Sequence, residues 1–318
     1  MESMRADKNA QVDKPAEIQP EKVFLPNELK DYVRYFQVPT RRWWWGLIAL
    51  VVGTMLFVLA LSLTGMLQSL LPREGEWAFP LALLTNSVAG GSLGILVVVL
   101  VSRLFYRQGF GWISSVEGRF RWKWFGMTAF VFAAGIILFD VVMNLAFPEL
   151  VEYELSFRPY TWGMIVIILL TTPLNAAMEE YFFRGLFARI IAAIVPLHRV
   201  GLILSALIST GVFMLLHTDS DLFRNIYYLS MGFLSWWLVY RTGGIEASVA
   251  YHAIVNVVGQ SILPFMDLSL LSNSVRGDAW SAINLIPIVM HILLVLIVDR
   301  IARRKGLVRM SSPSASVT

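Results

Sequence analysis

Two long stretches without a charged residue constrain the fold of this chain more than any other feature of the sequence. The first runs over 43–72 and the second over 77–102. A helix needs about 20 apolar residues to cross a hydrocarbon core of roughly 30 Å. Composition agrees, since 57% of the residues are hydrophobic and 15% are charged, against roughly 45–50% and 25% in soluble domains. We therefore expect an all-α helical bundle that is integral to a membrane.

The same criterion predicts about eight transmembrane helices. The run over 160–195 would be some 50 Å long as one straight helix. We therefore expect a kink or a broken turn near Pro173, which lacks a backbone N–H. The expected spans are 43–72, 77–102, 124–147, 160–195, 200–216, 225–240, 247–265 and 279–298.

The distribution of basic residues predicts the orientation. We expect a disordered cytoplasmic arm over 1–42, a transmembrane bundle over 43–299 and a basic cytoplasmic tail over 300–318. With both termini inside, four of the 26 lysines and arginines fall in outer loops, namely Arg73, Arg158, Arg224 and Arg276. That asymmetry follows the positive-inside rule. Because the basic residues lie between hydrophobic spans, no nucleic-acid partner is indicated.

Ionisable residues inside the spans require a functional or structural explanation, because a charge at mid-bilayer costs about 2.5–3.5 kcal/mol on insertion scales. The sequence offers seven such side chains and one polar companion: Asp140, Glu179, Glu180, Arg184, His217, His252, His291 and Asn256. We assign no role to Asp140 or His291. The others fall into three short motifs.

In the first motif, Glu180 and Arg184 are four residues apart and can pair on one helix face. Glu179 is rotated by about 100° and has no such local partner. A carboxylate in that position suits a general acid or base. The alternative is an interfacial cluster of ion pairs at a helix end.

The other two motifs contribute histidines. His252 and Asn256 share a helix face and can both donate hydrogen bonds, as an oxyanion requires. The alternative is a polar pair that holds two spans together. His217 ends its span, where a lone histidine is more often an interfacial residue than a ligand.

Other intramembrane chemistries find little support. The chain has no cysteine, which excludes thiolate metal sites and a cysteine nucleophile. It has neither a His-Glu-x-x-His sequence, typical of zincins, nor a Gly-x-Gly-Asp sequence. One rival is the G-x-S-x-G match at Gly90-Gly91-Ser92-Leu93-Gly94, which with His252 would form a serine/histidine dyad. These small residues equally fit a close helix contact.

Three motifs stand in order: Glu179-Glu180-x-x-x-Arg184, Phe213-x-x-x-His217 and His252-x-x-x-Asn256. Together they resemble the CPBP family of intramembrane proteases, which includes the CAAX prenyl endopeptidases and bacteriocin-processing and immunity proteins. The resemblance covers about 171–259, within a protease-like core at 160–265. It implies an integral protein of a bacterial plasma membrane that acts on a membrane-associated protein or peptide.

The resemblance also implies residue roles. Glu179 matches the glutamate that activates water, and Glu180 and Arg184 match the residues that brace it. His217 matches the histidine that positions the water, while His252 and Asn256 match the pair that stabilises the oxyanion. No cofactor is required with certainty. A metalloprotease would use a divalent metal such as zinc, with Glu179, His217 and His252 as ligands.

The sequence therefore predicts an intramembrane endopeptidase, in contact with membrane lipid, that hydrolyses a peptide bond near or within the bilayer. The alternative is a non-catalytic immunity or scaffold protein that retains the motifs as a polar core. The expected spans place two of the motifs at different depths. His252 is only some six residues into its span, which leaves a depth gap to Glu179 on the order of 15–20 Å. We expect the motifs to meet only if a span is tilted, short or broken.

Overall fold

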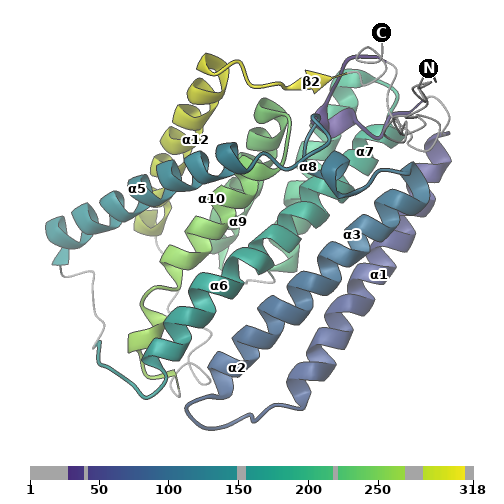
Figure 1. The fold of residues 1–318 in the computed structure, drawn as a ribbon. Helices are drawn as coiled ribbons and strands as arrows, with labels where there is room; N and C mark the ends of the chain where they lie inside the picture. The colour runs from purple at the N-terminus through teal and green to yellow at the C-terminus, as the bar shows by residue number, and fades with distance from the viewer. Residues whose placement is uncertain (1–27, 39–41, 149–154, 218–220, 269–281, 312–318) are drawn as a thin grey trace, which may run out of the picture.

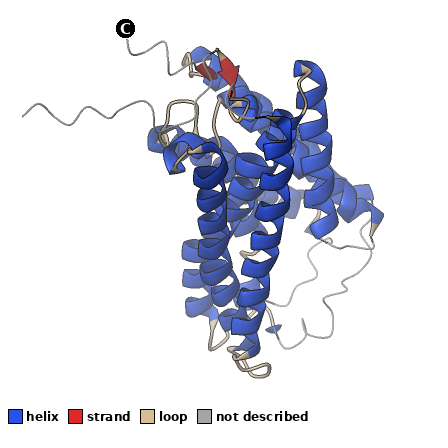
Figure 2. Cartoon of the chain, turned by 90° about the vertical axis from the view of Figure 1, so that its right-hand side faces the viewer, coloured by secondary structure: helices blue, strands red, loops and turns tan. Residues whose placement is uncertain are grey.

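Helices make up most of the chain that the structure describes. The computed structural model describes residues 28–38, 42–148, 155–217, 221–268 and 282–311. Figure 2 shows the helices, and the two short strands at the end of the bundle where the tail lies. The all-α membrane bundle expected from the sequence is confirmed. The helices are α1 (Trp43–Ser69), α2 (Ala78–Thr85), α3 (Gly91–Tyr106), α4 (Phe110–Ser114), α5 (Trp122–Ala146), α6 (Thr161–Glu180), α7 (Ala188–Ile194), α8 (His198–Leu216), α9 (Leu222–Thr242), α10 (Glu246–Gly259) and α12 (Ile286–Arg304).

Short elements connect these helices. Two π-helical turns, η3 (Asn86–Gly90) and η5 (Tyr181–Phe187), join α2 to α3 and α6 to α7 without a break. The single-turn elements are η2 (Tyr32–Arg34), η6 (Leu263–Phe265) and η7 (Ala282–Leu285). Strands β1 (Lys30–Asp31) and β2 (Met310–Ser311) pair antiparallel, with Lys30 opposite Ser311.

Five helical stretches are long and apolar enough to cross a membrane. They are Trp43–Ser69, Ala78–Tyr106, Trp122–Ala146, Thr161–Ile194 and His198–Leu216. Helices α9, α10 and α12 occupy the positions of the other three expected spans. Since α10 has 14 residues, it is about 21 Å long, and the count of eight crossings stays a prediction.

The helices differ from the expected spans at two places. Pro173 does not break its helix but lies inside α6, and the irregularity comes later, at η5. Neighbouring helices stabilise a proline within a membrane helix, and α6 packs between α3 and α10 (Figure 1). The last helix, α12, begins at Ile286, where Pro287 favours the first turn, and it runs to Arg304, beyond the expected end of the span at 298.

Small residues bring α3 against α6. Gly91 lies beside Leu174, whose carbonyl oxygen would be 3.3 Å from an added Cβ. An added Cβ on Gly94 would be 2.3 Å from Met178 Cγ. The G-x-S-x-G sequence is therefore a close helix contact, which membrane helices build from small residues. It places α3 against the part of α6 that carries the first motif.

Several segments form a layer over one end of the bundle, which we call the cap: residues 28–38, 107–121, 243–246 and 307–311. Besides the β1–β2 pair, Ser115 bridges to Gly244, and Ile245 N–H donates to the Ser114 carbonyl at 2.8 Å. Arg121 donates to Glu246 at 2.7 Å, and Glu246 is completely buried. The cap thus joins the segments before α1 and after α12, which both lie at this end (Figure 1).

The arm expected to be disordered is partly folded. Residues 1–27 and 39–41 lie outside the described residues, but 28–38 pack into the cap. Tyr32 is fully buried and donates a hydrogen bond to the Ile113 carbonyl, and burial raises the pKa of Tyr32 to about 12. Phe36 covers the buried guanidinium of Arg189, with 3.9 Å between Cζ and the ring centroid. This segment is ordered because its aromatic side chains pack on the buried guanidinium of Arg189.

Candidate active site

Glu179 and His252, separated in depth in the sequence-based prediction, are neighbours in the structure. Helix α10 runs antiparallel along α6, and its first residues lie level with Gly185, well before α7 ends at Ile194. The cap covers that buried helix start. The expected gap closes because α10 is short and starts deep in the molecule, while Glu179 lies near the middle of the continuous helix over 161–194.

Glu180 is the centre of a buried polar network. Its Oε1 accepts hydrogen bonds from Arg184 at 2.9 Å and from Nδ1 of His252 at 2.8 Å. Its Oε2 accepts from the hydroxyl of Ser248. Glu180, Arg184 and His252 are each at most 1% exposed. A buried charge needs this number of partners, since an unpaired carboxylate in an apolar interior is strongly unfavourable.

Arg184 also binds outside its ion pair. One guanidinium nitrogen donates to Glu180, and the other donates to the carbonyl of Gly232 on α9 at 2.9 Å. The guanidinium lies over the ring of Phe213, 4.7 Å from its centroid. The bracing pair predicted from the i,i+4 spacing therefore links α6, α8 and α9.

Glu179 is bound on one oxygen only. Its Oε1 accepts from Asn175 at 3.0 Å, whereas Oε2 is buried and has no hydrogen-bond partner among the described residues. That oxygen lies 3.7 Å from Nε2 of His252. Since an ionised Glu180 can only accept, we assign the Nδ1 proton to His252 in their hydrogen bond, which leaves Nε2 facing Glu179.

His217 joins this group through an aromatic ring. It follows α8, and its Nδ1 bonds to the carbonyl of Phe213 at 2.8 Å. The Phe213 ring centroid lies 4.5 Å from that of His217 and 5.8 Å from that of His252. On its other side His217 packs on Tyr228, at 4.2 Å. His217 therefore lies at the edge of the group.

Asn256 lies one turn beyond His252 on α10 and is half-buried. Its position on the same helix face agrees with the spacing argument. Five of the six predicted residues are thus linked by direct contacts around Glu180 and Phe213, and Asn256 adjoins them along the helix.

Sequence reasoning missed Asn175 and Ser248, and gave Phe213 no role of its own. Asn175 precedes Glu179 by four residues, and Ser248 precedes His252 by four. A polar residue one helical turn before each motif was the available signal, because i,i+4 side chains meet on a helix face. Ser248 and His252 both contact Glu180 from α10.

The three side chains predicted as metal ligands, Glu179, His217 and His252, do not converge on one point as a metal site requires. Among the described residues no group of three His, Cys, Asp or Glu side chains could hold a metal ion. Glu179 and His252 face each other, but Nδ1 of His217 is bound to a backbone carbonyl and its ring is packed between Phe213 and Tyr228. A zinc site needs three or four converging ligands at about 2.0–2.3 Å.

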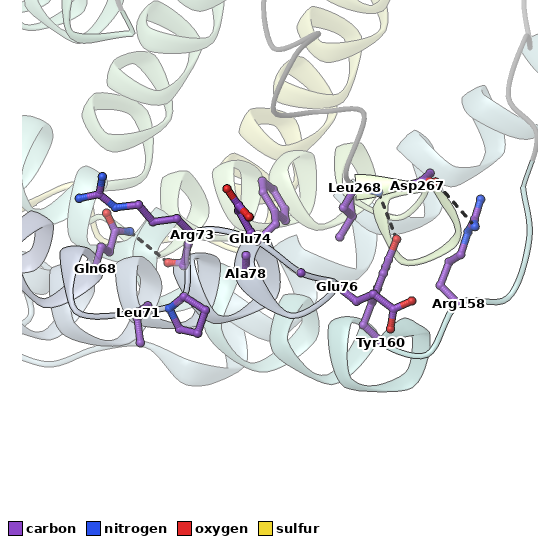
Figure 3. Close-up of a pocket in the computed structure, with 14 residues that line it drawn as sticks. Gln68, Leu71, Arg73, Glu74, Glu76, Ala78, Arg158, Tyr160, Asp267 and Leu268 are labelled. Atoms are coloured by element: carbon purple, nitrogen blue, oxygen red, sulfur yellow. Dashed lines mark hydrogen bonds and ion pairs between the residues drawn. The ribbon is translucent and has the colours of Figure 1, made fainter.

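Two other candidate sites lie apart from the network. Ser92 is exposed on α3 rather than turned toward His252, which is buried, so the geometry contradicts the serine/histidine dyad. A cavity of about 640 Å³ lies at the end opposite the cap, beside Arg73, Glu74 and Tyr160 (Figure 3). Tyr160 is about 29 Å from Glu179 along α6, and this cavity contains none of the predicted site residues.

Comparisons with known proteins match the part of the chain that carries the site. Residues 161–258 match the family described as type II CAAX prenyl endopeptidase Rce1-like. A protein of Bacillus subtilis (strain 168), called "Uncharacterized protein YyaK", is 26% identical over 169 residues, which cover 50% of this chain and 54% of the relative. No solved structure matches the chain. The resemblance predicted from the three motifs is confirmed for this segment, and the chain spans about half the length of its curated relative.

Proposed function

We propose that this chain is an intramembrane endopeptidase that hydrolyses a peptide bond near or within the bilayer. One observation carries the proposal. The free Oε2 of Glu179 is buried, lacks a hydrogen-bond partner among the described residues and lies 3.7 Å from Nε2 of His252. Two polar atoms at that separation can both hydrogen-bond one water molecule, which would occupy a site with a base beside it.

In the proposed reaction, Glu179 is the base. The water oxygen attacks the peptide carbonyl carbon, and a water proton passes to Oε2 of Glu179. The C–N bond then breaks, and Glu179 returns that proton to the leaving nitrogen. Asn175 holds Oε1 of Glu179, so that Oε2 stays turned toward His252 and the water. His217 would help to position the water from the edge of the site.

His252 and Asn256 would stabilise the negative charge that develops on the carbonyl oxygen. With its Nδ1–H bonded to Glu180, His252 would donate to that oxygen from a protonated Nε2. The Asn256 amide would supply the second donor. Removing one oxyanion donor typically costs about 10²–10³ in rate. The family match supports a CAAX-type protease.

The test is hydrolysis of quenched fluorescent peptides by the purified full chain and two variants. Glu179→Gln keeps the size of the side chain but cannot accept the water proton, so turnover should fall by about 10²–10⁴. Ser92→Ala is the control and should stay within a few-fold of the parent chain, because Ser92 is exposed on α3.

Near-normal turnover by Glu179→Gln would remove Glu179 as the base. Loss of activity in Ser92→Ala would favour the serine mechanism instead. If the parent chain itself cleaves no peptide in a broad panel, the non-catalytic scaffold becomes the better interpretation of the polar network.

A further inference from the structure

A second polar site lies on the other side of α10 from Glu180. Asp140 and His291, the two intramembrane ionisable residues that the proposed reaction does not use, line one cavity of about 330 Å³. Residues of α5, α9, α10 and α12, with Asn284 of η7, form its walls, toward the end of the bundle opposite the cap. Most of the walls are apolar, with Phe139, Val258 and Met290 among the lining side chains.

His291 is a buried polar group turned to this cavity. It is 2% exposed, and its Nδ1 pairs with the hydroxyl of Tyr251 at 3.1 Å. The rings of Tyr227 and Tyr251 pack around it, with centroids at 5.8 and 5.4 Å. The second nitrogen, Nε2, makes no hydrogen bond within the described part of the chain, so it is available to a ligand.

Asp140 supplies the charge. It lies in the last third of α5, is partly buried, and makes no ion pair or hydrogen bond with any described residue. Among the described residues that line the cavity there is no lysine or arginine. A carboxylate in a largely apolar membrane cavity calls for a positive partner, because intramembrane ionisable residues pair with one another or with a ligand.

We propose that this cavity binds an amphiphilic primary amine. The ammonium group has three N–H donors. They can bond to the Asp140 carboxylate and to Nε2 of His291, in the tautomer whose Nδ1–H donates to Tyr251, while an alkyl chain lies against the apolar walls. Apolar cavities with a few converging polar groups are the usual form of small-molecule sites. A bare divalent cation fits less well, since calcium takes six to eight oxygen ligands. An anionic or phosphate-bearing head finds no lysine or arginine among the described lining residues.

The experiment measures the melting temperature of the purified full chain in detergent against increasing hexylamine. Hexan-1-ol is the matched probe, with the same chain and no charge. Hexylamine should raise the melting temperature in a concentration-dependent way, and hexan-1-ol should not. Asp140→Asn should weaken the apparent affinity for hexylamine about tenfold or more, the typical scale for losing a charge-assisted hydrogen bond.

Three further variants make the result specific. Asp267→Asn makes the same chemical change at a partly exposed carboxylate beside the other cavity and should bind hexylamine as the parent chain does. Gly259→Leu fills the proposed site from a glycine with open space around it, and it should abolish the shift even if Asp140→Asn folds poorly. Glu179→Gln should keep the shift, because this site does not depend on hydrolysis.

Equal shifts with hexylamine and hexan-1-ol would overturn the proposal. So would an unchanged hexylamine affinity in either Asp140→Asn or Gly259→Leu.

Discussion

Two adjacent glutamates have different environments because consecutive helical side chains point about 100° apart. Glu180 is fully buried and bonded to Arg184, His252 and Ser248. Glu179 retains one oxygen without a partner in the described chain. The spacing in the sequence was sufficient to pair Glu180 with Arg184 and to leave Glu179 without a local cation. It could not predict that Ser248 bonds to Glu180, because that contact forms across two helices separated by 68 positions in the chain.

This difference predicts that Glu180→Gln destabilises the protein more than Glu179→Gln does. The amide at 180 would leave the buried guanidinium of Arg184 without its counter-charge, and breaking one side of a buried pair costs about 3–5 kcal/mol. The change at 179 removes a buried charge that has no cation on its own helix turn. Melting curves of both variants in detergent measure the difference.

The activity assay run beside those curves separates the two roles. We expect Glu180→Gln to be impaired as well, because Nδ1 of His252 loses its carboxylate partner. Melting of both variants at the parent temperature would contradict the bracing role of Glu180. It would leave the role proposed for Glu179 standing.

At the level of elements, the site depends on where helices begin. The sequence predicted the helices of the motif region, but it placed His252 only about six residues into its span and therefore far in depth from Glu179. The structure starts α10 under the cap, where Gly243 adopts a positive φ of 70° and Glu246 pairs with Arg121. That contact joins segments 125 residues apart, so no local pattern could predict it. Hydrophobic periodicity finds helices, whereas tertiary contacts fix their depth.

The contact between α3 and α6 gives a prediction at this scale. We expect Gly94→Ala to lower the melting temperature, because the new Cβ would be 2.3 Å from Met178 Cγ and 2.8 Å from its Sδ. Overpacking of this kind typically costs about 1–3 kcal/mol. Activity should fall too, since Met178 precedes Glu179. The matched control is Gly126→Ala on α5, where nothing lies within 4 Å of an added Cβ.

Alanine is the better helix former, so the control variant should melt at or slightly above the parent temperature. Equal behaviour of the two glycine variants would mean that α3 is not held against α6 by close packing. The small-residue explanation of the G-x-S-x-G sequence would then fail.

On the scale of the whole molecule, the cap brings four segments from distant parts of the chain into contact at one end of the bundle. Its segments come from before α1, between α3 and α5, between α9 and α10, and after α12. The aromatic residues of 28–38 were visible in the sequence, but their partner Arg189 lies on α7, so the arm looked unstructured. The cap also places most basic residues of the helix ends on one side of the bundle, as expected for the inner face of a membrane.

This arrangement predicts that the cap faces the cytoplasm. The chain has no cysteine, so single cysteines can be introduced without removing others. Arg119→Cys lies in the cap, where the arginine side chain is 76% exposed. Glu74→Cys lies in the exposed loop between α1 and α2 at the opposite end. A membrane-impermeant maleimide should label Glu74→Cys on intact cells, and Arg119→Cys only after the cells are broken.

The reverse pattern would place the arm and the tail outside and contradict the orientation drawn from the basic residues. Labelling of both sites on intact cells would mean that the bundle between them does not separate the two sides of a membrane, and a proteolytic site inside the bilayer would lose its basis.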